Sequence, residues 1–61
     1  MIKTLRLLNG QEVMAIIESA EKGEVVTDLD WLNLMYTMIV DVAIAQLVGD
    51  RVEKLKAQGQ S

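Results

Sequence analysis

The carboxylates between residues 24 and 30 are the side chains of this sequence best suited to bind a cation. Glu24, Asp28 and Asp30 lie close together along the chain, and carboxylate oxygens are the ligands that calcium and magnesium prefer. Their spacing does not match the calcium-binding loop of an EF-hand, in which carboxylate or carbonyl ligands recur at alternate positions. We therefore expect no metal site in this segment.

Residue types that support catalysis are largely missing. The chain of 61 residues contains no His and no Cys, which excludes the commonest general base, thiol nucleophiles, disulfides and the usual zinc frameworks. A nucleophile, a base and an oxyanion donor cannot be assembled from the remaining residues. We expect a protein that is not an enzyme, needs no cofactor and acts by binding.

The charges are unevenly distributed along the chain. The formal net charge is −3, and Lys22 is the single basic residue between positions 11 and 50. The other basic residues lie near the two ends of the chain, so a polyanion could be bound only where those ends converge. We expect no DNA binding and at most weak contact with RNA. The residues expected to make that contact are Lys3, Arg6, Lys22 and Arg51.

Asp41 is a carboxylate between two apolar residues, Val40 and Val42. Burying a carboxylate without a partner is costly, so this side chain either faces solvent or pairs with a cation. Arg6, Arg51 or a neighbouring subunit could supply that cation. We favour the solvent-facing interpretation.

The first 27 residues show the pattern of a three-stranded meander. Residues 2–8 place Leu5 and Leu7 on one face of a strand, and Asn9-Gly10 follows as the strongest short hairpin signal. A second apolar run at 13–17, a polar turn at 20–23 and a β-branched segment at 25–27 follow in order. We expect residues 1–27 to form this meander.

Residues 30–48 fit two kinds of element. As a helix, they place Asp30, Asn33, Thr37 and Asp41 on one polar stripe, with spacings of three, four and four residues. As a strand, they place seven successive apolar residues at alternate positions, from Leu32 to Ile44. The number of β-branched residues favours strand. We expect strands four and five within residues 31–48 and a short helix at 50–57.

Two motifs resemble the Sm-like family. Residues 5–13, Leu-Arg-Leu-Leu-Asn-Gly-Gln-Glu-Val, followed by Ile-Ile-Glu-Ser at 16–19, are similar to the first motif of that family. Residues 40–48 resemble the second motif of its bacterial Hfq-type members. The resemblance implies a mainly β fold, a bent five-stranded barrel in which strands four and five pair with neighbouring subunits to close a ring of six or seven copies.

The same resemblance implies an interface and an altered binding site. The apolar residues of strands four and five would form the subunit interface, namely Trp31, Leu34, Tyr36, Met38, Val40, Val42 and Ile44. The loop at 20–23 lacks the aromatic or Asn residue that holds a base in the family, and Asp41 stands where a basic residue is usual. A ring used for assembly or partner binding, with weak RNA contact, is therefore implied. Small Sm-like proteins that have diverged in this way are similar to Sm-like proteins encoded by bacteriophages.

A second architecture is an α+β module that dimerises. In it, residues 30–57 form one long amphipathic helix that covers the meander and associates through Trp31, Met35, Met38 and Val42.

Residues 31–48 are too polar for a comfortable membrane span, and the first residues lack the pattern of a signal peptide. We expect a cytoplasmic protein without a membrane partner.

Overall fold

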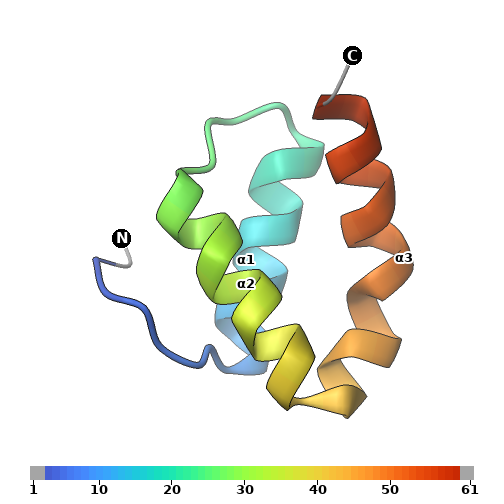
Figure 1. Cartoon of the computed structure of the whole chain (residues 1–61). Coiled ribbons are helices and arrows are strands. Elements are labelled where there is room, and N and C mark those ends of the chain that lie inside the picture. The colour runs from blue at the N-terminus through green and yellow to red at the C-terminus, as the bar shows by residue number, and fades with distance from the viewer. Residues whose placement is uncertain (1–2, 60–61) are drawn as a thin grey trace.

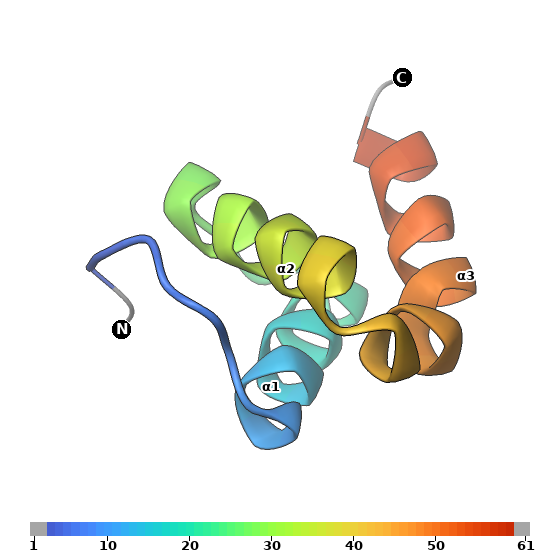
Figure 2. The same cartoon turned by 60° about the horizontal axis from the view of Figure 1, so that its bottom comes forward.

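The computed structural model describes residues 3–59, which form three helices and, within that range, no strand. They are α1 (Gly10–Glu21), α2 (Asp28–Val40) and α3 (Val42–Gly59), and each helix contacts the other two. An extended segment at residues 3–9 precedes α1 and runs beside α2, as Figures 1 and 2 show from two sides.

The expected five-stranded barrel is therefore wrong. The meander expected at 1–27 is replaced by an extended segment and α1, and strands four and five at 31–48 are replaced by α2 and the first part of α3. The first two residues of that meander lie outside the described range. The α+β alternative is also wrong about the meander, although the residues 30–57 that it expected to be helical lie in α2 and α3, apart from Asp41. The helix expected at 50–57 lies inside α3, so Gly49 and Asp50 are interior helical residues and not its start.

Asn9-Gly10 begins a helix instead of closing a hairpin. The Asn9 side chain accepts a hydrogen bond of 2.8 Å from the backbone N–H of Glu12, and the Glu12 carboxylate accepts one of 3.1 Å from the backbone N–H of Asn9. This reciprocal pair is a capping box, which satisfies two backbone donors that a helix start leaves free. The Asn-x-x-Glu spacing therefore determines the local structure, and the hairpin expected at Asn9-Gly10 is wrong.

Replacing Asn9 with Ala should destabilise the protein by about 1 kcal/mol, because the Glu12 N–H loses its acceptor and the capping box is broken. Chemical denaturation followed by circular dichroism measures this loss. An Asn9→Asp variant keeps an acceptor at the same position and should retain most of the stability. Equal stability of Asn9→Ala and the unmodified chain would contradict the role of the cap.

The turn expected at 20–23 is the C-terminal cap of α1. Gly23 has a φ of +81°, which favours glycine. The Gly23 N–H donates to the Ala20 carbonyl at 3.1 Å, and the Glu24 N–H donates to the Ser19 carbonyl at 2.9 Å. These two bonds define a Schellman motif, which ends the helix and leads the chain toward α2.

Asp41 separates α2 from α3. Its backbone is extended, with φ −108° and ψ 95°, and its carboxylate accepts a hydrogen bond of 3.2 Å from the Ile44 N–H. Asp41 is exposed, as expected, and it acts as a cap at the start of α3. The single long helix of the α+β alternative is therefore interrupted at this residue.

The core of the described residues is small and entirely aliphatic. One residue of the extended segment, three of α1, one of α2 and two of α3 are buried in it, and these are Leu8, Val13, Ile16, Ile17, Leu34, Val48 and Val52. Leu5 and Leu7, which the strand pattern placed on a buried face, are exposed. A core of this size leaves much of the apolar surface of α2 and α3 uncovered.

Candidate interaction site

The polar stripe of α2 is buried. Asp30, Asn33 and Thr37 are 2%, 0% and 1% exposed. The Asn33 side chain accepts a hydrogen bond of 2.7 Å from the Arg6 N–H through Oδ1 and donates one of 2.9 Å to the Thr4 carbonyl through Nδ2. The amide thus pairs with the extended segment much as the backbone of a neighbouring strand would.

Thr37 continues this pairing one helical turn further along α2. Its hydroxyl accepts a hydrogen bond of 2.9 Å from the Leu8 N–H and donates one of 2.8 Å to the Asn33 carbonyl. Alternate residues of an extended chain present their backbone groups on the same edge, so positions 4, 6 and 8 all meet α2. Within the described residues 3–8, the period-two pattern therefore accompanies an extended conformation, but its partner is a helix. Residue 2 of the pattern lies outside that range.

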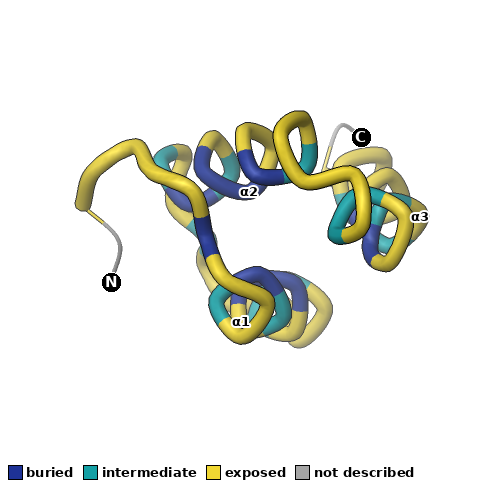
Figure 3. Tube along the Cα trace, turned by 90° about the horizontal axis from the view of Figure 1, so that it is seen from below, coloured by how far each residue is buried: buried dark blue, intermediate teal, exposed yellow. Residues whose placement is uncertain are grey.

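The apolar stripe of α2 faces the opposite way, into solvent. Leu32, Met35, Tyr36 and Ile39 follow the spacing i, i+3, i+4 and i+7, which places them on one side of the helix. They are between 39% and 77% exposed. In Figure 3, the buried side of α2 faces α1 and the exposed side faces away from it. We call these four residues the outer stripe.

A groove of about 310 Å³ lies between α2 and α3, next to the outer stripe. Met35 and Ile39 of the stripe also line the groove, together with Met38, Ala45, Val52, Glu53 and Lys56. Glu53 and Lys56 are exposed, and the Lys56 ammonium donates a hydrogen bond of 3.4 Å to the Met35 sulfur. The groove thus combines flexible apolar walls with one negative and one positive side chain.

The seven predicted interface residues do not share a surface. Leu34 is fully buried in the core, and three further residues pack partly against it, namely Trp31, Met38 and Ile44. Tyr36, Val40 and Val42 are exposed. Strand alternation excluded Ile39 from the set, and Leu32, although it belongs to the alternating run, was not included in it. The helical spacing of these two from Met35 and Tyr36 is the signal that identifies them.

The four predicted RNA contacts fall into two groups, arginines that pair with carboxylates and lysines that are exposed. Arg6 and Arg51 each hold a carboxylate: Arg6 pairs with Glu12, and Arg51 donates to Glu21 at 2.5 and 3.0 Å. Lys3 and Lys22 are exposed. The two guanidinium groups are therefore engaged within the chain, which weakens the case for a phosphate-binding surface.

Single-stranded RNA is expected to bind no more tightly than non-specific electrostatics allow, with a dissociation constant on the order of 10⁻⁴ to 10⁻⁶ M at physiological salt. The reason is that Arg6 and Arg51 would have to release Glu12 and Glu21 before contacting phosphate. Fluorescence anisotropy with oligo-uridine and oligo-adenosine measures the affinity. Nanomolar binding that persists at high salt would contradict this expectation.

The contact with Arg6 should make the stability of the protein pH-dependent. The Arg6 guanidinium, helped by the Asn9 N–H, lowers the pKa of Glu12 from 4.5 to about 2. Because the folded pKa lies below the unfolded one, the stabilisation is complete above pH 4.5 and is lost as the pH falls toward 2. Arg51 lowers the pKa of Glu21 in the same direction.

Chemical denaturation at several pH values tests this dependence. The free energy of unfolding of the unmodified chain should fall steadily between pH 4.5 and pH 2. A Glu12→Gln variant should show a flatter dependence, and Arg6→Gln should flatten it similarly because it removes the partner. An unchanged slope in both variants would show that the Arg6–Glu12 contact does not contribute.

Two further observations concern metal binding and membrane insertion. Between residues 3 and 59, no group of three or more carboxylates is placed to hold a metal ion. No helix in this range combines the length and the apolar character that crossing a bilayer requires.

The chain matches no family model, no curated protein and no solved structure. The resemblance of the two short motifs to Sm-like proteins is thus tested by no relative, and the barrel that it implies is wrong.

Proposed function

We propose that this protein is a non-catalytic interaction module that forms a homodimer through the outer stripe of α2 and the adjacent α2–α3 groove. The observation that carries the proposal is the orientation of α2, which buries Asn33 and Thr37 and exposes Leu32 and Ile39. A helix of a monomeric protein normally does the reverse. An apolar stripe next to an apolar groove is typical of a surface that binds another protein.

The size of the chain supports association. The described structure has an accessible surface of 4358 Å², and a standard interface removes about 800 Å² from each partner. Covering the outer stripe and the groove would stabilise each chain by about 25 cal/mol for every Å² of apolar surface removed from water. A domain of this length buries a smaller fraction of its surface than larger domains do, so this contribution is substantial.

A second copy of the chain fits the surface better than an unlike partner does. A two-fold axis brings the same patch of both copies together, so a groove must complement itself in charge. Glu53 and Lys56, which both line the groove, meet that requirement because an antiparallel arrangement would place the carboxylate of one copy opposite the ammonium of the other. The methionines at the groove can adapt to an inserted side chain.

Sedimentation equilibrium over a range of protein concentrations tests the proposal. We expect a species of twice the 6.8 kDa mass of the chain, in equilibrium with monomer on dilution. A mass of 6.8 kDa at every concentration up to the millimolar range would contradict the dimer. A closed assembly of more than two copies would contradict the two-fold arrangement.

A further inference from the structure

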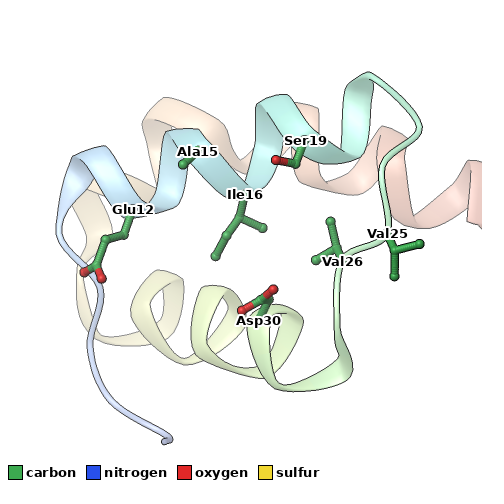
Figure 4. Close-up of a pocket in the computed structure, with 7 residues that line it drawn as sticks. All are labelled: Glu12, Ala15, Ile16, Ser19, Val25, Val26 and Asp30. Carbon is green, nitrogen blue, oxygen red and sulfur yellow. The ribbon is translucent and has the colours of Figure 1, made fainter. Parts of the chain in front are cut away.

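Sulfur distinguishes the α2–α3 groove from the apolar pocket between α1 and α2. Figure 4 shows Ile16 pointing into that pocket from α1, and Val26 lining it from the loop that follows. The residues that line the pocket carry no sulfur, whereas Met35 and Met38 both line the groove. The thioether sulfur of methionine is readily oxidised to a sulfoxide. The groove therefore offers a chemistry that the pocket lacks.

Exposure separates Met35 from the other described methionines. Met35 is 39% exposed, whereas Met14 and Met38 are half-buried against the aliphatic core. A Cβ placed on Gly49 of α3 would lie 3.9 Å from Cε of Met38, so the Met38 methyl group lies next to the α3 backbone. Among residues 3–59, Met35 is thus the methionine that a dissolved oxidant reaches most readily.

The Lys56 ammonium lies at the Met35 sulfur, to which it donates a hydrogen bond of 3.4 Å. A thioether sulfur is a weak acceptor, whereas the oxygen of a sulfoxide is a strong one. A hydrogen bond from an ammonium group to that oxygen is charge-assisted, which makes it roughly twice as strong as a bond between neutral groups. Lys56 therefore stabilises the sulfoxide form of Met35 more than the thioether form.

We propose that Met35 is an oxidation site through which peroxide weakens the homodimer. In the reaction, a lone pair of the Met35 sulfur attacks one oxygen of hydrogen peroxide and the O–O bond breaks. The sulfur loses two electrons and gains that oxygen, and the departing hydroxide takes the proton of the transferred hydroxyl group and leaves as water. The inference rests on the proposed dimer, because Met35 belongs both to the outer stripe and to the groove.

Oxidation changes the proposed interface in two ways. The dimer would bury the sulfoxide oxygen next to Ile39 and Val52, which line the same groove, and burying a polar group among apolar side chains is costly. The stronger bond to the sulfoxide also holds the Lys56 ammonium on its own copy, where it competes with the pairing to Glu53 of the second copy. Because the two-fold axis repeats both effects, we expect the dimer dissociation constant to increase at least about tenfold.

The first experiment tests the oxidation site independently of the dimer. Dilute protein, in which monomer predominates, is treated with a limiting amount of hydrogen peroxide, and tandem mass spectrometry locates the added oxygen. We expect Met35 to be oxidised at least about threefold faster than Met14 or Met38, because it is more exposed. NMR should then show a shifted Nζ signal for Lys56 and an unchanged one for Lys54. Equally fast oxidation of Met38, or an unshifted Lys56 signal, would overturn the site.

The second experiment measures the effect on the dimer. Sedimentation equilibrium compares the unmodified chain and Met35→Leu, each before and after the same peroxide treatment. The dissociation constant should rise only for the unmodified chain, because oxidation of the other methionines is common to both samples. Without oxidant, a Met35→Gln variant, whose carbonyl oxygen stands for that of the sulfoxide, should dimerise at least about tenfold more weakly than Met35→Leu.

Equal responses of the two chains to peroxide, or equal affinities of the Gln and Leu variants, would overturn the proposed effect of oxidation. Absence of a dimer in the untreated chain would refute the proposed function and with it this effect, whereas the oxidation site itself is decided by the first experiment.

Discussion

Replacing Ile39 with Glu is expected to convert the dimer into a monomer. Ile39 is the most exposed residue of the outer stripe and also lines the α2–α3 groove. The two-fold arrangement would bury two such carboxylates in each dimer, next to apolar side chains and without partners. We expect the dimer dissociation constant to increase by at least about 100-fold, which corresponds to roughly 2.7 kcal/mol.

Leu47→Glu provides the matched control for this variant. Leu47 is as exposed as Ile39, but it lies about 200° around α3 from Ala45, which lines the groove. It should therefore leave dimerisation unchanged. Sedimentation equilibrium compares the two variants, and far-ultraviolet circular dichroism verifies that each remains helical. A dimer that tolerates Ile39→Glu, or one that both variants disrupt equally, would contradict the proposed surface.

Replacing Asn33 with Ala is expected to destabilise the protein by about 2 to 3 kcal/mol. The substitution removes the partners of the Arg6 N–H and the Thr4 carbonyl and leaves a cavity at a fully buried position. Because a chain of this length is typically stable by about 3 to 9 kcal/mol, the loss would be a large fraction of the total. Chemical denaturation at a fixed protein concentration measures it.

The chain offers the same substitution at an exposed position as a control. Asn9→Ala removes a helix cap and is expected to cost about 1 kcal/mol. Amide hydrogen exchange adds a local measure, because Asn33→Ala should accelerate exchange at Arg6 whereas Asn9→Ala should not. If Asn33→Ala were no more destabilising than Asn9→Ala, the pairing of α2 with the extended segment would not contribute as described.

Part of this fold could be predicted from the sequence, because some signals were local. The spacing of Asn9 and Glu12 identifies a capping box as clearly as Asn9-Gly10 suggests a hairpin. Both signals are present, and the helix forms because α1 can bury Val13, Ile16 and Ile17 in the core. We predicted the hairpin because the segments on either side of it were assigned to strands from β propensity alone, and β propensity is a weak guide.

The helix of α2 was also visible in the sequence, whereas its orientation was not. The spacing of Asp30, Asn33 and Thr37 correctly described a helical stripe, but the β-branched residues favoured a strand. A polar stripe is normally solvated, and it is buried here because residues 4, 6 and 8 supply backbone partners to it. That contact joins segments almost thirty residues apart, so no local pattern could predict it.

The candidate interface depended on the same missing information. Tyr36, Val40 and Val42 were selected from the sequence and are exposed, whereas Leu34 was selected and is buried. Residues chosen at alternate positions are scattered over all faces of a helix. The helical period of 3.6 residues instead places Leu32, Met35, Tyr36 and Ile39 on one face. Once α2 is known to be a helix with a buried polar stripe, the outer stripe follows directly.

Isotope-filtered NMR on a mixture of labelled and unlabelled chains tests the central claim most directly, because it detects only contacts between copies. We predict cross-peaks that join the methyl groups of Leu32 and Ile39 in one copy to protons of Met35 or Tyr36 in the other. The methyl groups of Val48, which are buried in the core, should give none. Contacts between copies that involve Leu5 or Leu47 in place of the outer stripe, or no contacts at concentrations where dimer is present, would contradict the account.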